Sequence, residues 1–210
     1  MKNKRIGNLF ITMGVLLVAA ALGLNLYNHA ESDRAGKAAE NTVLQLESRL
    51  PEPVPAVRQE EAPAELAEWE ASTPDYLIDP EIEMPFSTVD GVNYIGVLSI
   101  PSLSIELPVI DRWDESLLKL APCRYTGSAY LDDLVICAHN YRTHFGSLKN
   151  IHIGDSITFT DVDGNLFSYE VVDIETLSAT SIEDMTTGDW ALTLFTCTMG
   201  GKTRLAVRAE

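Results

Sequence analysis

Residues 6–26 form a largely apolar run without a single Asp, Glu, Lys or Arg, and three basic residues lie within positions 2–5 just before it. About 20 apolar residues are enough for a helix to cross the hydrocarbon core of a bilayer. Positive flanks stay on the cytoplasmic side of such a helix. We therefore expect residues 1–5 to be a cytoplasmic tail, residues 6–27 a transmembrane anchor, and the rest of the chain to lie outside the cytoplasm.

A cleaved secretory signal peptide is the alternative interpretation of this run. Ala30 follows Asn28 and His29 in a setting that loosely resembles an A-x-A cleavage site. The run is longer than the roughly 7–15 apolar residues of a signal-peptide core, which favours an uncleaved anchor. Both interpretations place the remaining domain outside the cytoplasm.

Residues 28–88 are interpreted as a stalk followed by an acidic, proline-rich linker. Up to Leu50 the pattern is compatible with a helix that carries a thin apolar stripe. From Pro51 to about Ser72, prolines are interleaved with glutamates, and such a composition buries too little apolar surface to offset its ordering entropy. We expect this second part to be a mostly disordered spacer that holds the domain away from the membrane.

After about Val89 the chain changes to short apolar runs separated by turn residues, which is typical of an all-β domain. Short helices are expected at 115–120, 145–148 and 182–185. With about 120 residues and six to eight strands, a closed barrel removes exposed strand edges best. We predict that residues 89–210 form an all-β, closed or nearly closed barrel of about eight strands with short helices. The predicted strands are Tyr94–Ile100, Ile105–Ile110, Leu134–Ala138, Ser156–Thr160, Leu166–Leu177, Ala191–Cys197 and Arg204–Arg208.

The segment Asp161–Asn165 is predicted to be a hairpin turn between two of these strands. Gly164 can adopt the positive φ that such a turn requires. The carboxylates of Asp161 and Asp163 also allow a calcium loop, which is the less favoured alternative.

Charge and cysteine content exclude several classes of function. The formal charge of -16 argues against a nucleic-acid binder, because such proteins need clustered Lys and Arg to displace counterions from phosphates. The cysteines at 123, 137 and 197 are too few for a disulfide scaffold and lack the close Cys/His pairing of a zinc site. We expect neither a metal nor a cofactor.

One predicted strand ends in Cys197, and the next begins at Arg204 after a short loop. If the two strands form a hairpin, these residues face each other with Cβ atoms about 5 Å apart. The alternation of side chains along a strand places Arg204 and Arg208 on the face opposite to Leu205 and Val207. Arg204 is therefore expected to point away from the core, with the region around the sulfur of Cys197 within reach of its guanidinium.

A catalytic thiol needs a histidine partner, because the thiolate is the nucleophile and a free Cys is mostly protonated near neutral pH. His139 ends a strand-like apolar run, where a rigid element can hold a side chain in a cleft. His144, in the following loop, is the substitute candidate. His29 and His152 are less well placed. Taken alone, a Cys at a strand end is more often a buried hydrophobe than a nucleophile.

The combination of motifs resembles the sortase family. Thr193–Cys197 followed by Thr203–Val207 resembles the TLxTC…R signature of sortases. Tyr94–Pro101 with Ile105–Val109 resembles the opening strand pair of the family, and Ile136–Asn140 resembles its histidine motif, with the short segment Phe145–Leu148 after it. The resemblance extends over about residues 94–208.

The resemblance implies a sortase β-barrel with a groove for a sorting signal of the LPxTG kind, whose acyl group is transferred to an amine. It implies that Cys197 is the nucleophile, His139 the acid/base residue and Arg204 the cation beside the substrate carbonyl. Thr196 and Asn140 are expected to contact the substrate. The expected partners are surface proteins or pilins that carry the sorting signal, an acceptor amine of a cell-wall precursor or pilin, and the membrane.

Some alternatives stay open in the sequence. A thiol peptidase would use the same three residues to pass its acyl group to water, and a non-enzymatic envelope-binding barrel would need none of them. Cys123 and Cys137 are expected to serve packing, although a disulfide between them is an alternative. The stretch Tyr76–Pro80, just before the barrel, resembles the lids of some sortases only in part, because no aromatic residue follows Asp79-Pro80.

Overall fold

The computed structural model describes residues 2–56 and 74–210, with the side chains of residues 2–7 and 9 left aside. The chain divides after Arg34 into two compact units. The first consists of the amino-terminal part of helix α1 (Lys2–Glu47). By length and composition, this helix is long and apolar enough to cross a membrane. The second unit comprises residues 35–210.

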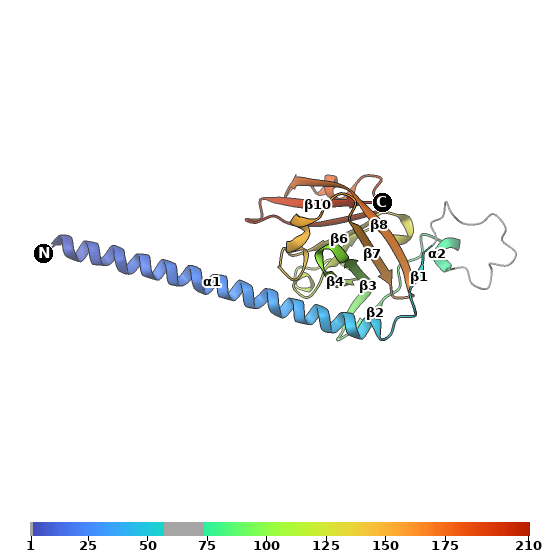
Figure 1. The fold of residues 1–210 in the computed structure, drawn as a ribbon, viewed down its shortest axis with the longest axis horizontal. Helices are drawn as coiled ribbons and strands as arrows, with labels where there is room; N and C mark the ends of the chain where they lie inside the picture. Colours follow the sequence, from blue (N-terminus) through green and yellow to red (C-terminus); the bar gives the residue numbers. More distant parts are fainter. Residues whose placement is uncertain (1, 57–73) are drawn as a thin grey trace. The chain divides into compact units, whose positions relative to one another are not determined.

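Eight strands of the second unit close into a barrel (Figure 1), in the order β8-β10-β9-β6-β5-β4-β3-β7 and back to β8. The predicted barrel of about eight strands is thus confirmed. The seven predicted strands are all present, and β5, which has only four residues and a register shift, is the one that the sequence did not indicate. The barrel strands are β3 (Val92–Ile100), β4 (Ile105–Ile110), β5 (Cys123–Thr126), β6 (Leu134–Ala138), β7 (Ser156–Asp161), β8 (Asn165–Ser178), β9 (Leu192–Cys197) and β10 (Thr203–Ala209).

Two further short strands extend the barrel sheet at its edges. β2 (Ser87–Val89) pairs antiparallel with β3, and β1 (Val54–Pro55) pairs parallel with β8. β1 lies in the segment that was expected to be a disordered spacer. Residues 51–56 are ordered instead, because backbone bonds of Val54 to Gly164 and of Ala56 to Leu166 hold them against β8. The rest of the expected spacer, from residue 57 onward, lies outside the described residues up to 73.

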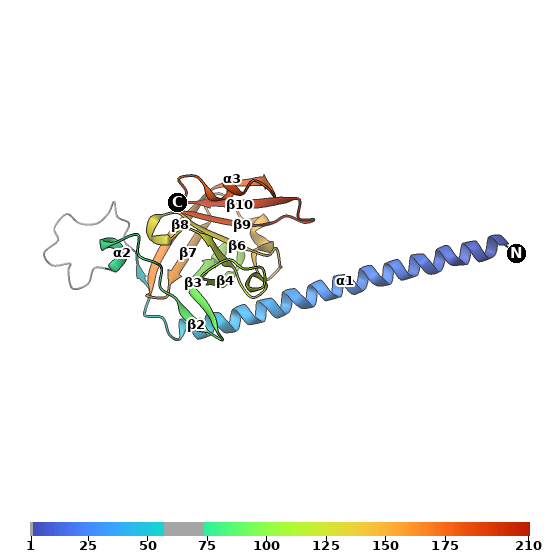
Figure 2. The same cartoon turned by 180° about the vertical axis from the view of Figure 1, so that it is seen from behind.

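The helices of the barrel unit are short, as predicted. α3 follows β8 and lies beside β9 and β10 (Figure 2), with contacts to β9. Three of the short helices coincide with the segments expected at 115–120, 145–148 and 182–185. The short helices are α2 (Asp75–Ile78), η2 (Pro101–Leu103), η3 (Leu117–Lys119), η4 (Ala129–Leu131), η5 (Phe145–Asn150) and α3 (Ile182–Thr186).

The carboxy-terminal part of α1 belongs to the barrel unit. Ala35, Ala39, Val43 and Leu46 are all at most 5% exposed, and spacings of three and four residues place them on one helix face. The expectation of a free stalk therefore needs correction. Of the predicted apolar stripe, Val43 and Leu46 pack on the barrel and Leu50 lies partly against it, whereas Leu44 is 62% exposed. The compact unit begins at Ala35 rather than near residue 89.

Both faces of strand β6 are buried, so the core has two layers. Leu134 and Ile136 belong to one cluster of buried side chains, while Val135 and Cys137 belong to a second one. The second cluster includes residues from the carboxy-terminal part of α1, and side chains of η3 and α3 add to it. A buried outer layer next to β6 and β9 gives these strands a rigid environment up to their ends.

The turn between β7 and β8 has the predicted hairpin form, with Gly164 at a φ of +86°. Asp161 is fully buried, and its carboxylate accepts hydrogen bonds from the Tyr130 hydroxyl at 2.8 Å, from the backbone of Asp163 and Asn165 at 2.9 Å, and from the Asn165 amide at 2.8 Å. These donors occupy the carboxylate. The described residues contain no group of three His, Cys, Asp or Glu suited to a metal ion, so the calcium alternative has no structural support.

Candidate active site

Three adjacent strands bring the predicted site residues together at one end of the barrel. β6 and β9 are parallel, with Ala138 opposite Thr196, so the residues that follow them, His139 and Cys197, leave neighbouring strands at the same level. β9 and β10 are antiparallel, with Arg204 directly opposite Cys197. The predicted hairpin register is therefore correct, and the thiol lies between the histidine strand and the arginine strand.

A side-chain hydrogen bond ties the ends of β6 and β9 together. The hydroxyl of Thr196 donates to the carbonyl oxygen of Ala138 at 2.8 Å, and both residues are 4% exposed. The predicted contact of Thr196 with a substrate stays a prediction, and its buried hydroxyl favours a positioning role. Asn140 is exposed directly after His139, so its substrate contact also stays a prediction.

The hairpin that carries Cys197 and Arg204 is closed by its own loop. The amide of Thr198 donates to the carbonyl of Thr203 at 3.0 Å, and the two hydroxyls lie 2.6 Å apart. The turn then requires positive φ at Gly200 and Gly201, of 88° and 71°, which glycine adopts without a steric penalty. A closed tip keeps Cys197 and Arg204 in register at its base.

The guanidinium of Arg204 lies along this loop. Its Nη1 donates to the carbonyl oxygens of Gly201 at 3.0 Å and Thr203 at 3.1 Å. A guanidinium has five N–H groups in a planar fork, so these two bonds hold the group in place while further N–H groups can serve a bound anion. Arg204 is therefore a fixed, partly exposed cation beside Cys197.

The three thiols differ sharply in environment. Cys197 is partly exposed, whereas Cys123 and Cys137 are buried, and all three are free. Burial raises the pKa of Cys123 to about 12 and also raises the pKa of Cys137. Cys123 and Cys137 lie directly opposite each other on β5 and β6 but form no disulfide, so the packing role is the one that the structure supports.

His139 is half-buried and lies at the start of a row of three aromatic rings. Its ring centroid lies 4.9 Å from that of Tyr141, which in turn lies 5.4 Å from that of His144. His144 is fully buried, and neither of its ring nitrogens has a hydrogen-bond partner among the described residues. Burial, followed by the charge of His139, lowers the pKa of His144 to about 4. The substitute candidate is thus a neutral buried ring, which leaves His139 as the more accessible of the two candidate histidines.

Arg208 does not share the environment of Arg204, although the two lie on the same face of β10. Arg208 is 1% exposed, and its guanidinium bonds to Glu175 Oε1 at 2.7 and 2.9 Å. It also donates to the carbonyl of Met185 at 3.1 Å and the hydroxyl of Thr193 at 2.9 Å, and to the carbonyl of Asp184. The expectation that this face of β10 points away from the core is wrong at Arg208, because α3 covers that part of it.

The stretch Tyr76–Pro80 does not cover the thiol. Tyr76 is buried and stacks on Tyr130, with ring centroids 4.7 Å apart and an interplanar angle of 12°. Tyr130 precedes the start of β6, while the site lies after the end of that strand, about 13 Å away along it. In Figure 1, α2 lies on the side of the carboxy terminus. The lid interpretation of this stretch is therefore not supported.

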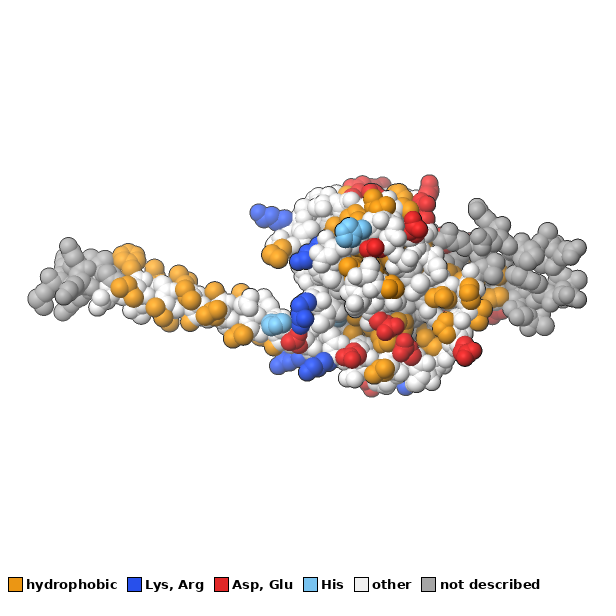
Figure 3. All heavy atoms as spheres, viewed as in Figure 1, with side chains coloured by type: hydrophobic (Ala, Val, Ile, Leu, Met, Phe, Trp, Pro, Cys, Tyr) orange, Lys and Arg blue, Asp and Glu red, His pale blue; other side chains and the backbone are white. Residues whose placement is uncertain are grey.

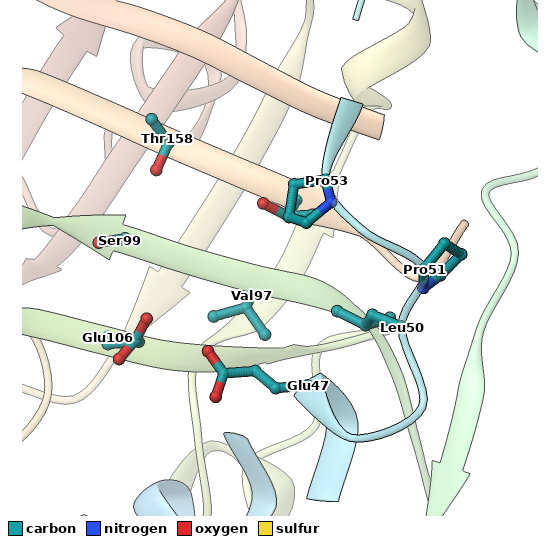
Figure 4. A pocket seen from close by; sticks show the side chains of 9 residues that line it. Glu47, Leu50, Pro51, Pro53, Val97, Ser99, Glu106 and Thr158 are labelled. Carbon is teal, nitrogen blue, oxygen red and sulfur yellow. The ribbon is translucent and has the colours of Figure 1, made fainter. Parts of the chain in front are cut away.

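Two hollows on the barrel unit lie away from Cys197. One, of about 340 Å³, lies over β3, β4 and β7, with the carboxylates of Glu47 and Glu106 on its wall beside Val97 (Figure 4). Burial and the neighbouring Glu47 raise the pKa of Glu106. The other, of about 380 Å³, lies beside Tyr76 and Tyr130. Neither includes a residue of the predicted site.

The face of the barrel that Figure 3 shows agrees with the acidic composition of the chain. The face of the barrel in Figure 3 carries scattered acidic side chains and no continuous basic patch.

The sequence did not indicate the supporting residues of the site. The hydrogen bond from Thr196 to Ala138 depends on the parallel pairing of two strands, and the two residues are 58 positions apart in the chain. The sequence does place an aromatic residue between two histidines, at positions 139, 141 and 144. Their spacing alone does not indicate that the three rings contact one another in a row.

Comparisons with known proteins agree with the geometry. Residues 98–210 match the family model described as "Sortase domain". The structure is similar to sortase C1 of Streptococcus agalactiae, with a TM-score of 0.51, 26% identity, and coverage of 59% of this chain and 69% of that one. It is similar in fold to a Clostridium perfringens sortase D5 transpeptidase (TM-score 0.50, 22% identity, 59% and 81% coverage). It is also similar in fold to sortase C2 of Group B Streptococcus pilus island 1 (TM-score 0.50, 19% identity, 86% and 97% coverage). No curated protein sequence gives a significant match.

Proposed function

The chain belongs to the sortase family, a family of cysteine transpeptidases, and from that premise we propose that it cleaves a sorting signal of the LPxTG kind between Thr and Gly and transfers the acyl group to an amine. The observation that carries this proposal is the site register. Cys197 lies directly opposite Arg204 and next to the strand that ends at His139.

The first half of the reaction forms an acyl-enzyme. The thiolate of Cys197 attacks the carbonyl carbon of the Thr–Gly bond, and the negative charge moves to the carbonyl oxygen. Arg204 and backbone N–H groups stabilise this oxyanion, a contribution that is usually the largest single one in acyl transfer. The C–N bond then breaks, and His139 as imidazolium gives its proton to the leaving amine. A thioester on Cys197 remains.

The second half reverses these roles. An amine attacks the thioester carbon and passes a proton to His139, and the C–S bond breaks to release the thiolate of Cys197. The new amide joins the sorted protein to its acceptor. The substrates that fit are surface proteins or pilins that end in a sorting signal, with an amine from a cell-wall precursor or a pilin.

The apolar part of α1 supports anchoring in the cell membrane, with the basic residues at positions 2–5 in the cytoplasm and the catalytic domain outside. Mass measurement of the protein recovered from membranes tests this part of the proposal. Residues before Tyr27 should still be present. A mature form that starts near Glu31 would instead establish a cleaved signal peptide.

A peptide assay tests the reaction. The full chain is incubated with a fluorescent Leu-Pro-Glu-Thr-Gly peptide, with and without triglycine as the amine. We expect a triglycine adduct that depends on Cys197, a thioester trapped on Cys197 by mass spectrometry, and no adduct with Cys197→Ala. Release of the free acid alone at saturating triglycine would identify a thiol peptidase. An active Cys197→Ala variant would reject the proposed nucleophile.

A further inference from the structure

Helix α1 approaches the loop after His139 so closely that only a glycine fits. A methyl group on Gly36 would lie 2.6 Å from Cγ2 and 2.7 Å from Cβ of Thr143. Because Cβ atoms do not approach carbon atoms at such distances, and the Thr143 Cβ is fixed to the backbone, a side chain at position 36 must move the helix or the loop. The absence of a side chain at Gly36 lets the helix backbone lie against the loop.

The position of Gly36 along the barrel is fixed by the residues that follow it. Ala39 belongs to one buried cluster of the barrel, and Val43 and Leu46 belong to the other. Thr42, on the same stretch of the helix, is 9% exposed. The helix therefore cannot slide or rotate to relieve a clash at position 36 without losing these contacts.

The loop that Gly36 contacts is itself folded tightly. The amide of Phe145 donates to the carbonyl of His139 at 3.2 Å, and the amides of His144 and Gly146 donate to the carbonyl of Tyr141 at 3.0 and 2.9 Å. A Cβ on Gly146 would lie 2.6 Å from the carbonyl oxygens at both 140 and 141. A displacement at Thr143 is thus carried to the backbone of His139.

The side chains of the same loop form a second connection. The ring of His144, next to Thr143, is fully buried and lies near the backbone of Ala35, without a hydrogen bond of normal geometry. It contacts Tyr141, which contacts His139. A buried imidazole without hydrogen-bond partners costs about 1–3 kcal/mol of unfolding free energy. The ring of His144 therefore acts through its packing against Tyr141 rather than through hydrogen bonds of its nitrogens.

We propose that α1 is a positioning element of the active site, in which Gly36 and the ring of His144 together hold His139 in place relative to Cys197. The inference rests on the proposed function, because it assigns a role in the reaction of those two residues. The helix that carries the proposed membrane anchor thus also completes the support of the acid/base residue.

The test is the variant Gly36→Ala in the full chain. Alanine favours a helix over glycine by about 1 kcal/mol, so a loss of activity cannot come from a weaker helix. We expect kcat in the peptide assay to fall about tenfold or more, as small misplacements of catalytic groups do, with KM changed by less than about twofold. Alkylation of Cys197 by iodoacetamide should persist.

A matched control and a compensating change make the test specific. Gly23 also lies in α1, but a Cβ there meets no described atom within 4 Å, so Gly23→Ala should leave kcat unchanged. Thr143→Gly removes the atoms that Gly36→Ala would contact. The kcat of the double variant Gly36→Ala/Thr143→Gly should therefore lie close to that of Thr143→Gly alone. Equal kcat in Gly36→Ala and Gly23→Ala would overturn the inference.

A second pair of variants tests the ring. His144→Phe keeps a buried aromatic ring against Tyr141 and should retain kcat near the wild-type value. His144→Ala removes the ring and should lower kcat with little change in KM. If His144→Phe loses as much kcat as His144→Ala, the imidazole nitrogens are needed and the positioning role of the ring is wrong.

A readout without substrate separates this inference from the proposed function. In protein with 13C-labelled histidine, the NMR signal of the His139 ring should shift in Gly36→Ala and stay in place in Gly23→Ala. If the wild type does not process the peptide, the proposed function fails, and this signal still decides the positioning role. An unmoved His139 signal in Gly36→Ala overturns the inference whatever the enzyme does.

Discussion

The hydroxyl of Thr196 bonds to the carbonyl of Ala138 at 2.8 Å, and each of these residues directly precedes a proposed catalytic one. The bond therefore sets the distance between the strand end that carries Cys197 and the strand end that carries His139. Its position favours a positioning role for Thr196, which the first prediction tests.

We predict that Thr196→Val lowers both stability and turnover. Valine keeps the shape but leaves a buried carbonyl without its donor, which costs about 1–3 kcal/mol of unfolding free energy. The ends of β6 and β9 then lose the hydrogen bond that joins them, so kcat per folded molecule should also fall. Urea denaturation and the peptide assay measure the two effects.

Thr193→Val is the matched control. Thr193 is buried on the same strand, and its hydroxyl accepts a hydrogen bond from Arg208 at 2.9 Å. We expect a loss of stability here without a loss of kcat per folded molecule. A similar fall of kcat in both variants would mean that the hydrogen bond between Thr196 and Ala138 does not position Cys197 and His139.

Selective thiol labelling is the second prediction. Only Cys197 is partly exposed, while burial raises the pKa values of Cys123 and Cys137 and thereby suppresses their thiolates. Iodoacetamide at neutral pH should modify Cys197 alone in the folded protein and all three thiols in urea. Peptide mapping by mass spectrometry checks this. Modification of Cys137 at a rate like that of Cys197 would contradict the buried environment.

The barrel could be predicted because its strands carry local signals. Runs such as Leu134–Ala138 and Leu192–Cys197 are apolar and bounded by turn residues, and the hairpin register of Cys197 and Arg204 follows from a short loop with two glycines. β5 was missed because it is short, and an irregular register interrupts it.

Features that depend on distant partners could not be predicted. The burial of Arg208 requires Glu175, which is 33 residues away, and the covering helix α3. The packing of the expected stalk requires barrel surface that is formed by residues from the far end of the chain. The ordering of Val54 and Pro55 requires an open edge of β8, which a proline-rich composition does not reveal.

Acid should destabilise the protein through His144, as the third prediction. Its pKa is about 4 in the folded protein against 6.5 in the unfolded chain, so between these values the unfolded state binds more protons. The stability due to the neutral ring is present above pH 6.5 and is lost as the pH falls toward 4. The difference between pH 7 and pH 4.5 is about 2 kcal/mol.

His144→Phe tests this origin, because phenylalanine cannot bind the proton. The groups that face the ring are His139, Tyr141 and the backbone of Ala35, and all of them remain in the variant. The variant should lose about 2 kcal/mol less unfolding free energy than the wild type between the two pH values. Equal losses in urea denaturation would place the acid sensitivity elsewhere.

The last prediction separates the two arginines of β10. Arg204 is partly exposed and held by two carbonyls of the loop and strand start, whereas Arg208 is buried and bonded to Glu175 and to two carbonyls of α3. Arg204→Lys keeps the charge but loses the planar fork, so kcat should fall on the order of 10² or more, as on loss of an oxyanion donor. Its unfolding free energy should change by less than about 0.5 kcal/mol.

Arg208→Lys should show the opposite pattern, because a lysine cannot reproduce the two N–H groups that donate to Glu175 Oε1 and leaves buried partners without donors. We expect a loss of several kcal/mol of unfolding free energy and a kcat per folded molecule within about twofold of the wild type. Alkylation of Cys197 should persist in Arg204→Lys, because reaction with iodoacetamide forms no tetrahedral oxyanion. If Arg208→Lys abolishes turnover in the folded protein while Arg204→Lys retains it, the cation of the reaction must be reassigned.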